Sequence, residues 1–229
     1  MHWILQDNIF NEQGFNAMVE TLRRFDIPFS EHKVVPFVGE ILPDANPTGK
    51  VVCMGSYSMR HLAKERGWTP GVWDLGDQDF LVQLDNWGHH MLNHDATVVE
   101  FQHAKIPNLR AFVRPIEDSK VFAGGVFDKE NFEGWQHRIC ELNEHPNGTT
   151  LASDTLVQVC SLREIWSEYR FWVIRGEIVT SSLYKMGTTV RYENGAPEGI
   201  TEFVQERIAE WEPHEAFVID AADTPEGYK

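Results

Sequence analysis

The sequence predicts an α/β first half and an α+β second half, and two patterns carry this prediction. In the first half, short apolar runs alternate with amphipathic helical patterns, an order that favours a small parallel sheet flanked by helices. In the second half, strand patterns predominate and two helical patterns interrupt them, which is typical of antiparallel strands with helices on one side. We place the boundary near Asp95, so the predicted domains are residues 1–95 and 96–229.

The first half contains three expected strands and two expected helices. The first helix has Phe15, Met18, Val19 and Leu22 at helical spacing. The second helix is expected to end at Gly67, because glycine accepts the left-handed conformation that often ends a helix. The expected strands are Trp3–Phe10, Phe29–Phe37 and Lys50–Met54, and the expected helices are Gly14–Phe25 and about Ser58–Arg66.

The rest of the chain is expected to be richer in strands. A helix is expected around Leu84–Asn93, just before the boundary. Near the end of the chain, Phe203, Val204, Ile208 and Trp211 form the apolar stripe of another helix. The elements expected after the boundary are strands at Arg110–Arg114, Val121–Val126, Leu156–Cys160 and Ala216–Ile219, a hairpin at Tyr169–Lys185, and helices at about Asp128–Glu144 and Thr201–Trp211.

The composition argues against several classes of protein. The chain has 229 residues, 42% of them hydrophobic, which is enough to bury a substantial core. The 35 acidic residues outnumber 20 basic ones and give a net charge of −15, so we expect no nucleic-acid partner. Cys53, Cys140 and Cys160 are far apart and odd in number, which predicts reduced thiols. Because we find no signal peptide and no run of 18 apolar residues, we expect a soluble cytoplasmic protein.

The most informative segment is the hairpin that ends at Lys185. Arg175-Gly176 is expected to form a two-residue turn, which fixes the residues that lie opposite each other. Charges gathered on one sheet face cost desolvation energy unless a ligand or a partner offsets it. The pattern therefore predicts either a binding face or a set of surface ion pairs. The residues expected on this face are Glu168, Arg170 and Trp172 together with Val179, Ser181 and Lys185.

A second cationic segment lies earlier in the chain. Arg114 and Lys120 flank Pro115 between two strand patterns, and Gly124-Gly125 follow. Two cations and adaptable glycines suit the covering of a triphosphate, because the cations pair its charge and the glycines let the backbone approach closely. The alternative, which the segment alone favours, is a solvated hairpin with ordinary surface charges.

Three further features carry weaker signals. The apolar strand Leu156–Cys160 could present main-chain groups to an adenine edge, although a plain core strand is the alternative that the segment alone favours. Asp220 follows the apolar strand Ala216–Ile219 and could bind Mg²⁺ through its carboxylate. His90 and His94 lie four residues apart, a zinc-ligand spacing, but no third ligand is evident, so we interpret them as a polar helix end.

Taken in order, these segments resemble the ATP-grasp superfamily. The resemblance is strongest to a clade of small, often phage-encoded ATP-grasp proteins that is defined by a conserved Arg/Lys set, and it extends over nearly the whole chain. The alternating first half resembles the domain that precedes the ATP-grasp domain in that superfamily. The segments that carry the resemblance are FVRP at 112–115, DSK at 118–120, LVQV at 156–159, the hairpin EYRFWVIRGEIVTSSLYK at 168–185, and FVID at 217–220.

The resemblance implies a role for each of the four cations. Arg114 matches a phosphate-contacting residue at the end of a strand, and Lys120 matches the basic residue of a glycine-containing flap. Arg170 and Lys185 match the hairpin cations of the clade, which face the triphosphate. Arg170 and Lys185 are therefore the expected catalytic residues.

The resemblance also implies contacts with the adenosine moiety. Gln158, Val159 and Cys160 match the linker that contacts adenine. Either Glu164 or Glu168 matches the acidic residue that binds the ribose, and the match does not choose between them.

Asp220 matches the first of the acidic positions that hold magnesium in the superfamily, so ATP and Mg²⁺ are the implied cofactors. A later strand of the superfamily supplies a Glu and an Asn that complete the metal site. This chain ends at Pro225–Lys229, where that strand should begin, and we expect either a fragment or a variant with an incomplete metal site. Nucleotide binding could survive such a loss, whereas phosphoryl transfer relies on the charge of the metal.

The resemblance implies an ATP-dependent carboxylate–amine ligase that acts through an acylphosphate on small-molecule or peptide substrates. The chain shows no Ser-His-Asp or Cys-His signature, which agrees with a reaction that needs no side-chain nucleophile. One alternative is a non-catalytic nucleotide-binding or interaction protein, which an incomplete metal site would favour. Another is a plain α/β protein whose hairpin charges are surface ion pairs.

Overall fold

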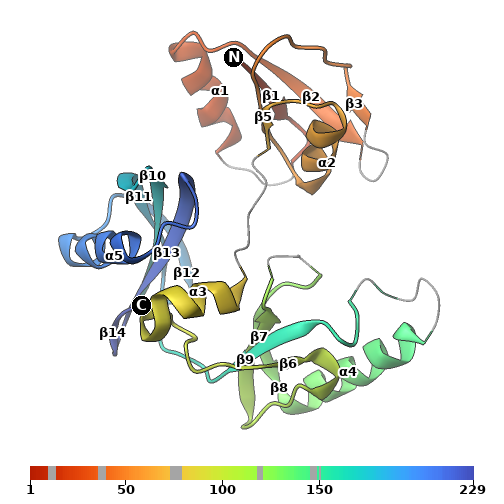
Figure 1. Cartoon of the computed structure of the whole chain (residues 1–229), viewed down its shortest axis with the longest axis vertical. Helices are drawn as coiled ribbons and strands as arrows, with labels where there is room; N and C mark the ends of the chain where they lie inside the picture. Colours follow the sequence, from red (N-terminus) through yellow and green to blue (C-terminus); the bar gives the residue numbers. More distant parts are fainter. Residues whose placement is uncertain (10–13, 36–39, 73–78, 118–120, 145–148, 150) are drawn as a thin grey trace. The chain divides into compact units, whose positions relative to one another are not determined.

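The computed structural model describes residues 1–9, 14–35, 40–72, 79–117, 121–144, 149 and 151–229. The chain forms two compact units, Met1–Leu75 and Gly76–Lys229. The first unit has a mostly parallel sheet, and the second has two antiparallel sheets (Figure 1). The predicted α/β first half and α+β second half are thus confirmed.

The first unit has a helix on each face of one sheet. Its elements are β1 (His2–Gln6), α1 (Phe15–Arg24), β2 (Phe29–Val35), β3 (Glu40–Leu42), β4 (Val51–Met54), α2 (Tyr57–Glu65) and β5 (Pro70–Gly71). The strand order is β3-β2-β1-β4-β5, and β1 runs parallel to both of its neighbours. Consecutive residues of β1 point to opposite faces. Leu5 packs against Val19 and Leu22 of α1, whereas Ile4 packs against Met59 of α2 (Figure 1).

The first sheet of the second unit is covered on one face by a helix. Its elements are β6 (Thr97–Glu100), β7 (Arg110–Pro115), β8 (Gly125–Asp128), α4 (Lys129–Asn143) and β9 (Leu156–Cys160). The strands lie in the order β6-β9-β7-β8, and every neighbouring pair is antiparallel. Phe132 of α4 is fully buried in one cluster with Phe101, Val113 and Val157. Asp128 caps α4, since its carboxylate accepts the N–H of Asn131 at 2.9 Å.

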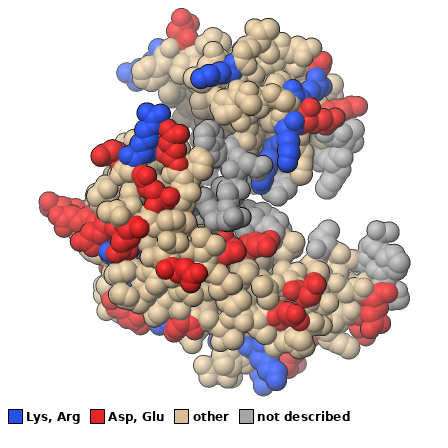
Figure 2. Space-filling view, in the orientation of Figure 1, with Lys and Arg blue, Asp and Glu red and all other residues tan. Residues whose placement is uncertain are grey.

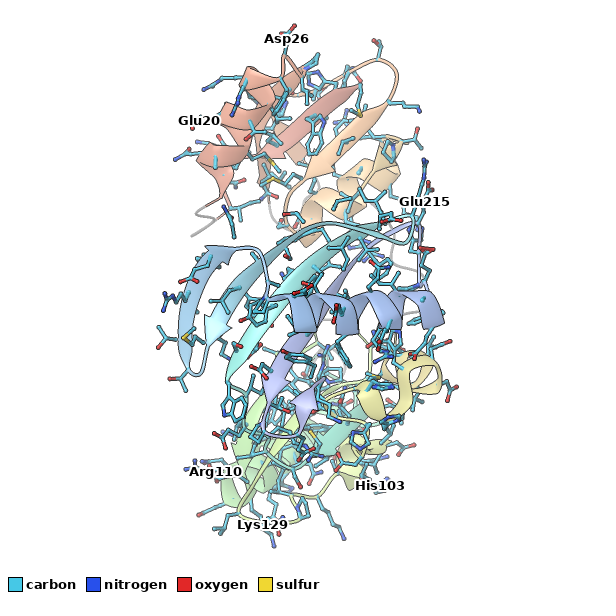
Figure 3. All side chains as sticks on the ribbon, turned by 90° about the vertical axis from the view of Figure 1, so that its left-hand side faces the viewer. Glu20, Asp26, His103, Arg110, Lys129 and Glu215 are labelled. Carbon is cyan, nitrogen blue, oxygen red and sulfur yellow. The ribbon has the colours of Figure 1, made fainter. Side chains whose placement is uncertain are left out.

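The second sheet of this unit also has a helix on one face. Its elements are β10 (Ser167–Ile174), β11 (Glu177–Met186), β12 (Thr189–Asn194), α5 (Glu198–Glu210), β13 (Ala216–Thr224) and β14 (Gly227–Tyr228). The strand order is β12-β11-β10-β13-β14, and α5 crosses the strands (Figure 3). Phe171 and Ile219 pack with Val204 of α5. Trp172 and Val218, which point to the other face, stay exposed.

The helix expected at Leu84–Asn93 lies earlier in the chain. It is α3 (Phe80–Trp87), and Asp79 caps it by accepting the N–H of Val82 at 2.9 Å. Gly88 has a φ of 52°, a left-handed value that ends the helix there. A 3₁₀ turn follows at Gly88–His90, so His90 and His94 do not share a helix face. In a second difference, β8 begins at Gly125 rather than at Val121.

Helix α3 belongs to the second unit. Trp87 Nε1 donates to the carbonyl oxygen of Arg207 in α5 at 2.9 Å, and the Trp87 ring meets that of Trp211 edge-on at 5.0 Å. The compact units therefore divide at residues 75/76, and the predicted domain boundary at 95/96 differs from this division by α3 and the turns that follow it. No described helix is long and apolar enough to cross a membrane.

Candidate functional site

Four of the predicted site residues meet on the face of the β10–β13 sheet that lies opposite α5. Lys185 Nζ donates to Glu168 Oε1 at 2.6 Å. Arg170 holds Asp220 with two hydrogen bonds, Nε to Oδ1 at 2.7 Å and Nη2 to Oδ2 at 2.8 Å. The second pair spans directly opposed residues of β10 and β13. Two ion pairs, each neutral overall, therefore occupy neighbouring positions on this face.

Two β-bulges shift the register of the predicted hairpin. Arg170 lies opposite Ser182, whereas the prediction placed Ser181 there. Ser181 instead lies opposite the buried Phe171 and on the α5 face, because a slip of one residue moves a side chain to the other face. Val179 falls at the other shift and leaves its expected partner. The predicted places of Ser181 and Val179 on the charged face were therefore wrong.

The bulge nearer the end of β11 brings an unpredicted residue, Tyr184, to the charged face. Its hydroxyl donates to Glu168 Oε2 at 2.6 Å, and the Arg170 guanidinium lies 5.3 Å from the centre of its ring. Regular alternation would place Tyr184 and Lys185 on opposite faces. The bulge lets both contact Glu168, and nothing in the sequence pattern indicates it.

The electrostatics of this face fix the charge states of two groups. Hydrogen bonding to Asp220 raises the pKa of Arg170 further above its usual value. Burial, followed by the hydrogen bond to Glu168, raises the pKa of Tyr184. At neutral pH, Arg170 is therefore a cation and Tyr184 a neutral hydrogen-bond donor.

Two more predicted residues lie together on the other sheet of the second unit. Arg114 of β7 and Gln158 of β9 are directly opposed, on the face away from the α4 core. Gln158 is buried and accepts from Asn93 Nδ2 at 3.3 Å. A side chain at Gly124 would put its Cβ 2.8 Å from that of Arg114, so the glycine is needed for this approach. Lys120, the flap cation, lies outside the described residues.

Strand β9 offers fewer free main-chain groups than the sequence led us to expect. It lies between β6 and β7, and Gln158 and Val159 pair with both neighbours. Cys160 pairs with Phe112, and burial raises the pKa of its thiol to about 11. In contrast, the main chain of Ser161–Glu164 makes no hydrogen bond to the backbone of any other described residue. Main-chain groups able to meet a ligand thus begin after β9.

Arg163 anchors this linker. Its Nη2 donates to Asp95 Oδ2 at 2.5 Å, and its Nη1 donates to Glu226 Oε1 at 3.3 Å. The hydrogen bond from Arg163 lowers the pKa of Asp95. Glu164 follows as an exposed residue and accepts from Trp166 Nε1 at 3.1 Å. One cation therefore joins the linker to the end of the α3 region and to the turn between β13 and β14.

The described residues supply little for a metal ion beyond Asp220. No group of three or more His, Cys, Asp and Glu side chains among them is arranged to hold a metal. Strand β14 pairs with Asp223 and Thr224, and no described strand continues along the outer edge of Ala216–Ala221. A single carboxylate suits magnesium when nucleotide phosphates and water supply the other ligands. Asp220 fits that kind of site and not an all-protein one.

Cavities and surface charge add context. Two open cavities of about 590 and 510 Å³ lie in the first unit, and neither borders a predicted nucleotide residue. On the visible surface, acidic side chains cover more area than basic ones (Figure 2), in line with the net charge of −15. The cations on the β10–β13 sheet are therefore a local feature of an acidic chain.

The fold and the charged hairpin face define an ATP-grasp protein. A sequence model of an ATP-grasp domain, described as family 2 of its clade, matches residues 93–228, more than half of the chain. The chain belongs to this family. A comparison with curated proteins gives no match.

Solved structures with the same fold are distant in sequence. A D-cycloserine synthetase, DcsG, is similar with a TM-score of 0.60 and 11% identity, covering 99% of this chain and 88% of that one. The D-alanine–D-alanine ligase from Bacillus anthracis gives 0.58 and 10%, covering 99% and 83%. The macrocyclase MdnC from Microcystis aeruginosa MRC, bound with the precursor peptide MdnA, gives 0.52 and 9%, covering 100% and 89%. These likenesses establish the fold.

Proposed function

We propose that the protein is an ATP-dependent carboxylate–amine ligase that acts through an acylphosphate intermediate. The observation that carries this proposal is the set of two ion pairs on one open sheet face of an ATP-grasp domain, Arg170–Asp220 and Lys185–Glu168. Such pairs hold cations ready at a site where a polyanion could exchange with the carboxylates. The similar structures named above include two enzymes of small amino acids and one bound with a peptide, which supports carboxylate and amine substrates of either size.

The proposed reaction has two steps. An oxygen of the substrate carboxylate attacks the γ-phosphorus of ATP, the bond to the β,γ-bridging oxygen breaks, and ADP leaves. The amine nitrogen then attacks the acylphosphate carbonyl, and the tetrahedral intermediate collapses with loss of inorganic phosphate. The amine gives up a proton, and the product is an amide. No side-chain nucleophile is consumed in either step.

Each residue of the charged face has a role in this scheme. Arg170 stabilises the negative charge on the transferring phosphoryl group and on the tetrahedral oxygen. Lys185 binds the triphosphate, and Arg114 and Lys120 do so from the other sheet. Asp220 would hold a magnesium ion, whose charge offsets that of the phosphates when it is bound.

The adenosine contacts shift by a few residues from those first expected. Because Gln158 and Val159 are paired on both sides, we assign the adenine contact to the free main chain of Ser161–Glu164. Both oxygens of Glu168 already have partners, so exposed Glu164 is the better candidate for the ribose hydroxyls.

One observation favours a second function, a nucleotide-binding protein without catalysis. Among the described residues, Asp220 offers the only carboxylate that we can assign to a magnesium ion, and Arg170 occupies both of its oxygens. In this alternative the protein binds nucleotide and shows no carboxylate-dependent turnover.

The test is ADP release with a panel of amino acids and peptides as carboxylate and amine donors. A ligase releases ADP and phosphate only when a suitable carboxylate is present, and added hydroxylamine converts the acylphosphate to a hydroxamate. Oxygen-18 in the carboxylate is then expected in the released phosphate. Nucleotide binding with no carboxylate-dependent ADP across the panel would support the non-catalytic alternative instead.

Replacement of Lys185 by alanine is expected to weaken ATP binding by about tenfold, because one charge-assisted contact with the phosphates is lost. Calorimetric titration with a non-hydrolysable ATP analogue measures the effect. Lys33→Ala, which removes an exposed lysine from β2 of the first unit, is the control and should leave the affinity unchanged. Equal losses in the two variants would contradict the assignment of Lys185.

A further inference from the structure

Tyr184 is the one side chain that contacts both ion pairs of the charged face among the contacts that the structure describes. Its hydroxyl donates to Glu168 Oε2 at 2.6 Å. Its ring lies beneath Arg170, with the guanidinium carbon 5.3 Å from the ring centre. The residue is half-buried, and the β-bulge places it beside Lys185.

Glu168 depends on the two donors that it shares with this corner of the sheet. Lys185 occupies Oε1 and Tyr184 occupies Oε2, each at 2.6 Å. The Glu168 side chain is only 17% exposed, whereas that of Lys185 is 38% exposed. Lys185 can therefore turn toward a ligand, but Glu168 cannot turn to water. A mostly buried carboxylate that loses its partners is strongly disfavoured.

We propose that Tyr184 is a positioning residue of the nucleotide site, which keeps Glu168 hydrogen-bonded when Lys185 leaves it for the triphosphate. The same ring supports the Arg170 guanidinium from below, so that it is held in place when Asp220 is drawn to a cation. This inference rests on the proposed function, because it presupposes that a triphosphate draws Lys185 away. The raised pKa of Tyr184 keeps its hydroxyl protonated as a donor throughout the neutral range.

The test is a double-mutant cycle on ATP affinity with Tyr184→Phe and Glu168→Gln. Tyr184→Phe keeps the ring and removes only the hydroxyl, so the fold is retained, which the melting temperature checks. Alone, it is expected to weaken binding of a magnesium-bound, non-hydrolysable ATP analogue by about tenfold. In the Glu168→Gln background, the same change is expected to have little effect, since no charge needs the hydroxyl. Tyr192→Phe, at an exposed tyrosine on neighbouring β12, is the matched control.

Each outcome decides the matter. A loss in Tyr184→Phe that disappears with Glu168→Gln supports the positioning role. Wild-type affinity in Tyr184→Phe, or the same loss in both backgrounds, overturns it while the proposed nucleotide site stands. If the wild-type protein binds no ATP at all, the proposed function fails, and the positioning role fails with it.

Discussion

Replacing Arg170 with alanine is expected to lower turnover by about 10²–10³-fold and to leave the fold intact. Removal of one preorganised donor to a developing oxyanion has an effect of about this size. The stability effect should stay within about 1 kcal/mol, because the Arg170 and Asp220 side chains are each 44% exposed and such ion pairs contribute little. The rate of ADP release and the urea unfolding midpoint measure the two quantities.

The hairpin provides a matched control for this variant. Arg175 is also paired with a glutamate, since its Nε donates to Glu215 Oε1 at 2.6 Å. Glu215 is labelled in Figure 3 and lies at the hairpin tip. Arg175→Ala should therefore change neither turnover nor nucleotide affinity. If Arg170→Ala unfolds the protein and the surviving material binds ATP normally, Arg170 is a structural residue.

Magnesium is expected to tighten ATP binding through Asp220 by tenfold or more, which corresponds to about 1.4 kcal/mol of coupling free energy. Without the ion, the triphosphate can take Arg170 only by leaving Asp220 unpaired and close to like charge. With the ion, Asp220 gains a cation as Arg170 gains a phosphate, and both charges stay compensated. Calorimetric titration of ATP with and without magnesium gives the ratio of the two affinities.

Asp220→Asn should change this ratio in a distinctive way. The amide removes the like charge and frees Arg170, so ATP without magnesium should bind more tightly than it does to the wild-type protein. The ratio should then fall toward one. Asp223→Asn is the control, because Asp223 lies three residues further along β13, an odd spacing that points it to the opposite face. An unchanged ratio in Asp220→Asn would show that Asp220 takes no part in binding the ion.

Much of the charged face could be predicted from the sequence. Arg170 and Glu168 are two residues apart on one strand, so alternation alone places them on the same face. Asp220 follows the apolar run of the strand that pairs with β10, and its position opposite Arg170 came from the resemblance together with the fold. Lys185 was placed correctly even though the register was wrong, because the bulges displaced it along the strand and not off the face.

The rest could not be predicted, for physical reasons that differ from residue to residue. Tyr184 reaches the site through a bulge, and bulges arise from packing across strands that a single sequence does not display. Strand β12, Thr189–Asn194, is exposed at every residue and therefore lacks the apolar alternation that marks a strand. Strand β6 has only four residues, too few for a periodic pattern. The position of α3 depends on the Asp79 cap and on Gly88, which we had not weighed against its apolar residues.

The most direct test of the account is the melting temperature of the protein with and without magnesium and ATP. The account predicts stabilisation by about 2.7 kcal/mol at a ligand concentration of about 100 times the dissociation constant. Arg170→Ala and Lys185→Ala should reduce that stabilisation, whereas Arg175→Ala should not. If melting is unchanged by ATP, ADP and a non-hydrolysable analogue, the charged face is a set of surface ion pairs and the nucleotide site does not exist there.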